Sequence, residues 1–167
     1  MIRKAIPADI PLLAEIYEDA KIFMHENGNP TQWAGGYPNR ESLEGDLEKG
    51  LLYTVESDTE PGRIAGAFSM LTTPDPTYAV IYDGSWLSDT PYAAIHAVVS
   101  DRKEKGMVKK IMAFVRESHD HIRVDTHKDN LPMQGALIRD GFTLQGTIIC
   151  HDGTPRVAFE WVKQTIS

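Results

Sequence analysis

The stretch "AAIHAVVSDRKEKGMVKKIMAFV", residues 93–115, contains the features that decide the fold. Its first eight residues form the most apolar strand candidate of the chain, which predicts a central strand. Apolar residues then recur at helical spacing from Val108 to Val115, which predicts a helix with one buried face. The two elements meet in a loop that contains Gly106 and a cluster of basic residues.

The basic residues of this loop allow two interpretations. They are Arg102, Lys103, Lys105, Lys109 and Lys110. A helix N-terminus already carries partial positive charge, so additional cations there suit a bound phosphate, which Gly106 would let the backbone approach closely. A solvated helix start with a turn glycine explains the same residues, and charge alone does not decide between the two.

The composition is that of a soluble globular protein. The 167 residues are 41% hydrophobic and 25% charged, which predicts one domain that spans residues 1–167. The formal net charge of -7 argues against a nucleic-acid partner. No run of about eighteen apolar residues and no apolar leader occurs, so we expect no membrane partner. A lone cysteine, Cys150, cannot form an internal disulfide and fits a cytoplasmic location.

The remaining pattern predicts a mixed α/β or α+β fold with one main sheet. We expect strands at residues 2–5, 51–57, 63–71, 93–100, 122–127, 142–150 and 156–163, the last two as an antiparallel pair. We expect a first helix that Asp9 caps, another that follows Asn39, and a third that begins near Val108. A further helix is expected to have Asp129 or Asn130 as its cap and to end at Gly141. Residues 77–86 are either a further strand or an irregular arm.

Two motifs link this pattern to a known family. Residues 103–108, "KEKGMV", match a pyrophosphate loop of the form Arg/Gln-x-x-Gly-x-Gly/Ala at Gly106, with Lys103 and Val108 as departures. The segment "DNLPMQGALIRDGF" supplies an Asn at 130 and a Gly-Phe pair at 141–142. With the order of elements, these motifs make the whole chain resemble the GNAT superfamily of acyl-CoA-dependent N-acetyltransferases.

The resemblance implies a central, mixed, mostly antiparallel sheet of six to seven strands with about four helices. It also implies transfer of an acetyl group from acetyl-CoA to an amine of a small molecule or protein, by direct attack in a ternary complex. The cofactor-binding residues that it implies are Ala97, Val98, Val99, Lys103, Glu104, Lys105, Gly106, Met107, Val108, Lys109 and Asn130. Many family members carry a tyrosine acid where this chain has Leu137, so a non-catalytic module that binds CoA or a protein is the alternative.

His96 and Tyr92 are the candidate catalytic residues. His96 lies on the predicted central strand, and an imidazole with a pKa of about 6.5 can take a proton from an amine near neutral pH. A buried histidine with a backbone partner is the other interpretation of His96. Tyr92, four residues earlier, is either the acid that replaces Leu137 or a core aromatic, and we favour the core role. Tyr82 and Asp83 are weaker candidates.

The loop "NPTQWAGGYP", residues 29–38, is the candidate acceptor wall. Gln32, Trp33 and Tyr37 would line an apolar pocket with polar handles, and Trp86 would add to it. A turn-rich loop held by its aromatics is the competing interpretation.

The histidines show no metal-ligand spacing, so we expect no metal. Asp125 and His127 share a strand face, but two ligands do not define a site. Cys150 is expected as a strand residue rather than as a nucleophile. A homodimer is possible, but no feature of the sequence decides the oligomeric state.

Overall fold

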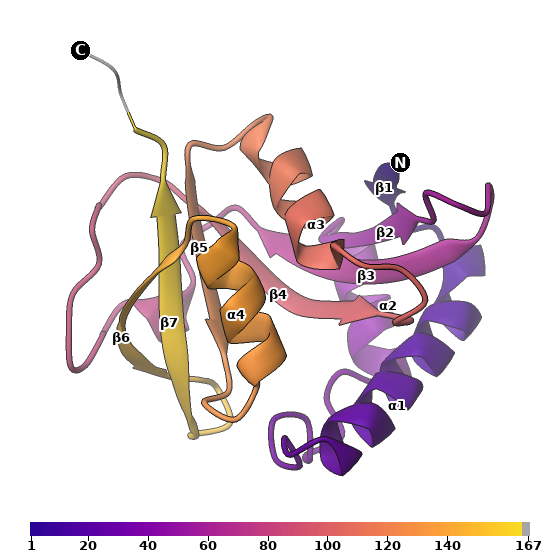
Figure 1. Ribbon diagram of the computed structural model, residues 1–167, viewed down its shortest axis with the longest axis horizontal. Coiled ribbons are helices and arrows are strands. Elements are labelled where there is room, and N and C mark those ends of the chain that lie inside the picture. Colours follow the sequence, from indigo (N-terminus) through magenta and orange to yellow (C-terminus); the bar gives the residue numbers. More distant parts are fainter. Residues whose placement is uncertain (165–167) are drawn as a thin grey trace.

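The computed structural model describes residues 1–164, and a seven-stranded sheet organises them in the order β1-β2-β3-β4-β5-β7-β6 (Figure 1). The strands are β1 (Ile2–Lys4), β2 (Leu52–Glu56), β3 (Ile64–Leu71), β4 (Ala93–Ser100), β5 (His121–Thr126), β6 (Thr143–Ile149) and β7 (Pro155–Val162). Neighbouring strands are antiparallel except for β4 and β5, which are parallel. The predicted mixed, mostly antiparallel sheet with a central β4 is confirmed.

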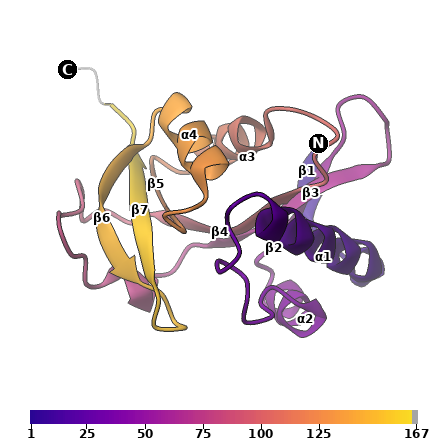
Figure 2. The same ribbon diagram turned by 60° about the horizontal axis from the view of Figure 1, so that its bottom comes forward.

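Helices cover both faces of the sheet (Figure 2). They are α1 (Ile10–Glu26), α2 (Arg40–Glu48), α3 (Met107–Arg116) and α4 (Leu131–Arg139). On one face, Ile111, Met112 and Val115 of α3 are fully buried in the main core, as their spacing predicts. On the other face, Leu13 and Tyr17 of α1 pack in a second core.

Asp9 does not cap α1 as predicted. It ends a short 3₁₀ helix, η1 (Pro7–Asp9), and within the described residues its carboxylate makes no capping hydrogen bond to α1. The carboxylate instead accepts hydrogen bonds from the Arg3 guanidinium and from the Ile6 backbone N–H, both at 2.8 Å. The nearby guanidinium gave the carboxylate a stronger partner than a helix amide.

The central strands β4 and β5 part after a short paired segment. Only Ala93, Ala94 and Ile95 of β4 have β5 partners in register. A bulge follows in β4, because Ala67 pairs with Val99 and Ser69 with His96, which leaves one additional residue on β4. Ala97 lies in this bulge with φ of 53°, and its carbonyl accepts a hydrogen bond from the Tyr17 hydroxyl at 2.6 Å. The bulge turns β4 away from β5 and opens a gap between them (Figure 1).

Residues 72–92 form an irregular arm rather than a further strand. The arm contains a 3₁₀ helix, η2 (Pro76–Tyr78), and a single bridge between Tyr82 and Thr147 of β6. The Arg123 guanidinium stacks on Trp86 at 4.1 Å and on Tyr92 at 4.3 Å. The arm therefore returns the chain across the sheet and places Asp75 beside β4. Among residues 1–164, no helix is long and apolar enough to cross a membrane.

Candidate active site

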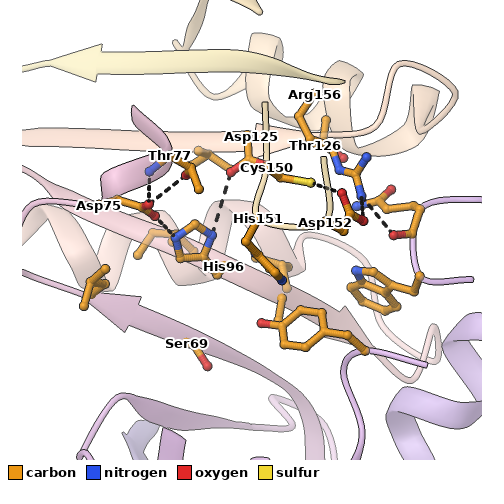
Figure 3. A pocket seen from close by; sticks show the side chains of 18 of the residues that line it. Ser69, Asp75, Thr77, His96, Asp125, Thr126, Cys150, His151, Asp152 and Arg156 are labelled. Carbon is orange, nitrogen blue, oxygen red and sulfur yellow. Dashed lines mark hydrogen bonds and ion pairs between the residues drawn. The ribbon is translucent and has the colours of Figure 1, made fainter. Parts of the chain in front are cut away.

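A cavity of about 550 Å³ lies where β4 and β5 part (Figure 3). Both strands line it, through residues 95–98 of β4 and 124–126 of β5. The other walls come from the loop before α2, the hairpin between β6 and β7, and residues of α1, α2, β3 and the start of α4. This volume lies in the range of small-molecule sites.

His96 projects into this cavity between two carboxylates (Figure 3). Its Nε2 lies 2.7 Å from Asp75 Oδ2, and its Nδ1 lies 3.8 Å from Asp125 Oδ1. Asp75 precedes η2, and its Oδ1 accepts hydrogen bonds from the Thr77 N–H and hydroxyl. Asp125 Oδ1 accepts a hydrogen bond of 2.6 Å from the Tyr78 hydroxyl. Three elements thus hold the imidazole and its two acidic neighbours.

The two carboxylates and the imidazole shift one another's pKa. Burial alone would raise the pKa of Asp75, but hydrogen bonds from His96 and Thr77 lower it to about 2. Burial also acts to lower the pKa of His96, yet the hydrogen bond to Asp75 and the charges of Asp125 and Asp75 raise it above 6.5. Asp75 is therefore ionised at neutral pH and can only accept a hydrogen bond, so Nε2 of His96 carries the hydrogen.

The predicted acceptor loop lines the cavity. Gln32, Trp33 and Tyr37 all face it. Burial, with nearby carboxylates, raises the pKa of Tyr37 to about 12, so its hydroxyl stays protonated at neutral pH. Asn130 caps α4 through its Oδ1 and donates to Gln32 Oε1 at 2.9 Å, which ties the loop to the start of α4.

Trp86 and Tyr92 lie outside the cavity. Trp86 packs against Tyr78 and donates its indole N–H to the Tyr78 carbonyl at 2.9 Å. The Tyr92 hydroxyl accepts a hydrogen bond of 2.8 Å from the Asp75 N–H, so Tyr92 supports the segment that carries Asp75. Leu137 is fully buried in the main core. Tyr92 is partly buried and packs against the small core that contains Tyr78, and the side chain at position 137 carries no acidic group.

Several residues of the cavity had no role in the sequence-based prediction. Asp46 accepts a hydrogen bond from the Ser69 hydroxyl at 2.7 Å, and the β6–β7 hairpin contributes Cys150, His151, Asp152 and Arg156. Cys150 lies one residue beyond β6 rather than in the strand, and its thiol donates to Asp152 Oδ1.

Asp75 follows a proline and precedes another, which is a turn signal, but nothing in the sequence shows that it meets His96. Within residues 1–164, no group of three histidine, cysteine or acidic residues is placed to hold a metal.

The basic loop ends at an open helix start. Gly106 adopts a left-handed conformation with φ of 82°, and no described side chain caps α3. Met107 and Val108 pack against the main core, so the side chain of Val108 does not cover the first-turn amides. Lys103, Lys105 and Lys109 are exposed and form no ion pair within residues 1–164.

Two charged side chains of this loop serve other contacts. The Glu104 carboxylate accepts from Arg63 at 2.5 Å and from the Asp58 N–H at 2.8 Å, so it is turned toward the β2–β3 hairpin. Lys110 donates to the Glu56 carbonyl and to Asp58. The cations that are left at the start of α3 are Arg102, stacked on Phe23 at 4.5 Å, and the three exposed lysines.

These features match the two polar parts of CoA. The N–H groups of the first helical turn and the lysines suit a pyrophosphate. The edge of β4 beyond Ile95 has no partner strand within the described sheet, so its backbone groups can pair with the amides of an extended chain such as pantetheine. The residues present therefore fit acetyl-CoA.

Comparisons with known proteins agree with this geometry. Neither a protein-family model nor a curated protein matches the sequence. Among solved structures, a GNAT-family acetyltransferase from Streptococcus agalactiae is 26% identical, with a TM-score of 0.88 over 99% of this chain and 96% of that chain. The acetyltransferase yncA from Salmonella typhimurium, solved with its cofactor acetyl-CoA, is 15% identical, with a TM-score of 0.63 over 100% and 95% of the two chains.

An aminoglycoside N-acetyltransferase, AAC(6')-Ib11, is 20% identical, with a TM-score of 0.63 over 98% and 96% of the two chains. The two neighbours with lower identity share the fold, whereas the Streptococcus structure also shares a quarter of the sequence over nearly its full length. Together with the parted central strands and the open start of α3, these likenesses place the chain in the GNAT superfamily of acetyltransferases, which use acetyl-CoA as co-substrate.

Proposed function

We propose that this chain transfers the acetyl group of acetyl-CoA directly to an amine bound in the cavity, with His96 as the general base. The observation that carries the proposal is the position of His96. It faces the cavity beside the gap between β4 and β5, and it is hydrogen-bonded to an ionised carboxylate.

Acetyl-CoA supplies an acetyl thioester. The chain would hold its pyrophosphate with the first-turn amides of α3 and with Lys103, Lys105 and Lys109. The backbone of β4 from Ala97 to Val99 would pair with the pantetheine arm. This arrangement would place the thioester near the bulge in β4, within reach of an acceptor beside His96.

The acceptor side of the cavity favours a cationic amine. Asp46, Asp125 and Asp152 line it and outnumber the two lining cations, Lys49 and Arg156, while Trp33 and Tyr37 add apolar surface. Carboxylates bind an ammonium group, while the aromatic rings contact the carbon skeleton that carries it.

The chemistry needs two proton transfers. The acceptor ammonium gives one proton to the His96 imidazole, because only the neutral amine has a lone pair. The nitrogen then attacks the carbonyl carbon, the C–N bond forms and the C–S bond breaks. The nitrogen loses its second proton and the sulfur gains one, so the products are an amide and the free CoA thiol. No side chain is acylated.

Thermal unfolding and thiol release together test the proposal. A ligand that binds only the folded chain stabilises it by about 2.7 kcal/mol at one hundred times its dissociation constant. We expect acetyl-CoA and CoA to raise the melting temperature and ATP to raise it little. We also expect free thiol to appear when a panel of primary amines is added with acetyl-CoA. Stabilisation without thiol release would favour a non-catalytic CoA-binding module instead.

A further inference from the structure

We infer that Asp75 is a positioning residue that holds His96 in the tautomer with a bare Nδ1, so that a primary ammonium can bridge Nδ1 and Asp125. The inference rests on the proposed function, because the ammonium is the acceptor of that reaction. It adds two things to that function: the residue that decides which ring nitrogen of His96 carries the hydrogen, and the two groups, Nδ1 and the Asp125 carboxylate, that bind the substrate ammonium.

Asp75 can present only one of its oxygens to His96. Oδ1 accepts from the Thr77 N–H at 2.9 Å and from the Thr77 hydroxyl at 2.7 Å. The Asp75 N–H donates to the Tyr92 hydroxyl at 2.8 Å, which fixes the backbone as well. Oδ2 is then left to face Nε2 of His96 at 2.7 Å. Asp75 as a residue is only 8% exposed, so solvent has little access to this contact.

The hydrogen on Nε2 leaves the lone pair of the neutral ring on Nδ1. Nδ1 lies 3.8 Å from Asp125 Oδ1, which is too far for a direct hydrogen bond. An ammonium nitrogen that lies to one side of the line joining these two atoms can be about 2.9 Å from each, and it can donate one hydrogen to Asp125 and one to Nδ1. His96 and Asp125 both line the cavity, so an acceptor reaches this position without displacing protein.

The groups around His96 suit a proton that moves from the ammonium to Nδ1. Asp75 and Asp125 flank the ring, Asp46 lies farther off on α2, and the ring of Tyr78 lies 5.9 Å away. Tyr37 and Tyr78 stay protonated because burial raises the pKa of each hydroxyl. The imidazolium formed after the transfer is therefore flanked by a carboxylate on each side.

The substitution Asp75→Asn separates this inference from a general structural role. The two donors of Thr77 hold the amide oxygen of Asn in the place of Oδ1, so its NH₂ group faces His96. Nε2 must then accept, and the hydrogen of the neutral ring moves to Nδ1. We expect the ¹⁵N shifts of His96 to show an Nε2–H tautomer in the wild type and an Nδ1–H tautomer in the variant. We expect kcat to fall on the order of 100-fold, with rate loss at every pH.

Asp125→Asn provides the complementary test. It keeps the Tyr78 hydroxyl contact but removes the charge that holds the ammonium, so we expect KM for the amine to rise about tenfold while the tautomer stays Nε2–H. Asp19→Asn, on the exposed side of α1, is the matched control and should change neither quantity.

Titration with butylamine, without acetyl-CoA, tests ammonium binding apart from catalysis. We expect the Nδ1 resonance of His96 to shift in the wild type and not in Asp125→Asn. An Nδ1–H tautomer in the wild type, an unchanged tautomer in folded Asp75→Asn, or no response to the amine would each overturn the inference, even for a chain that acetylates amines. The expected tautomers and amine response without thiol release would instead refute the proposed function and leave the ammonium site standing.

Discussion

His96 on β4 and His121 on β5 each bond a carboxylate through Nε2, at 2.7 Å to Asp75 and 2.5 Å to Glu160. His121 and Glu160 lie where β5 and β7 pair continuously, and His121 is only 2% exposed. Its Nδ1 also has protein partners, the carbonyl and hydroxyl of Thr90, both at 3.0 Å. His96 lies where β4 and β5 part, and its Nδ1 has no hydrogen-bond partner among the described residues.

The difference teaches that what a histidine bonded to a carboxylate can do depends on what its second ring nitrogen contacts: protein groups at His121, and a cavity at His96, where we propose chemistry. Glu160 accepts from His121, from Arg123 and from the Leu87 N–H, so this closed pair fastens the irregular arm to the sheet. The open pair at His96 has one ring nitrogen fixed and one turned toward a cavity. The predictions below test this contrast.

Exchanging each histidine for glutamine should separate the two roles. In His96→Gln, the proposed base is lost, so we expect kcat/KM for the amine to fall on the order of 100- to 10,000-fold with little change in melting temperature. In His121→Gln, we expect the opposite, with normal activity per folded molecule and a lower melting temperature. Steady-state thiol release and thermal unfolding of both variants provide the measurements. Equal activity losses in the two variants would contradict the assignment of a catalytic role to His96 and a structural role to His121.

The closed pair should matter most for stability. Glu160→Ala leaves His121, Arg123 and the Leu87 N–H without their shared acceptor in a buried position. Loss of one partner of a buried charged network costs about 3–5 kcal/mol. We therefore expect the free energy of unfolding in urea to fall by about this amount. Glu117→Ala, at an exposed position after α3, is the control. A loss below about 1 kcal/mol would mean that the arm is held by its aromatic stacking instead.

The open pair should make stability depend on acid. The pKa of Asp75 is lowered from 3.8 to about 2 in the folded chain, so its contribution is complete above pH 3.8 and is lost as pH falls toward 2. The shift corresponds to about 2 kcal/mol. His96 has the opposite sign. Its pKa is raised above 6.5, so its contribution is complete below pH 6.5 and declines as pH rises through the raised value.

Urea unfolding at a series of pH values from 2 to 9 measures both effects. Asp75→Asn should remove the Asp75 part of the acid dependence and lessen the alkaline decline, because His96 loses its main partner. Asp19→Asn should follow the wild-type curve. The interpretation fails if Asp75→Asn and the wild type have parallel curves over the whole range.

The sequence predicted the fold more completely than it predicted the candidate site. The helical spacing of Ile111 and Val115 and the apolar run of β4 are local signals, and the structure follows them. The motifs around Gly106 and Asn130 indicated the family for the same reason. The meeting of His96 with Asp75 is not local. It depends on a bulge in β4 and on the path of an irregular arm, and neither has a pattern in the sequence.

Two residues show where local signals mislead. Asp9 has the composition of a helix cap, but the Arg3 guanidinium takes its carboxylate. Val108 departs from the small residue of the family motif, yet its side chain packs into the core and leaves the helix amides open. In both cases a contact from outside the motif decides what the residue does.

Substitutions in the basic loop should have the smallest effect, a change in CoA affinity. They extend the comparison from buried charged pairs to exposed charges. Lys103, Lys105 and Lys109 are solvated, so each should contribute only about 0.3–1 kcal/mol to binding a pyrophosphate at a helix N-terminus. The triple alanine variant should therefore bind CoA about tenfold more weakly by titration calorimetry, and added salt should reduce the difference because exposed charges are screened. A variant with Lys4 and Lys163 replaced by alanine changes charge elsewhere and should bind as the wild type does. Equal affinity of the triple variant at low salt would show that the backbone amides of α3 suffice, so that solvated cations add nothing even beside an anion.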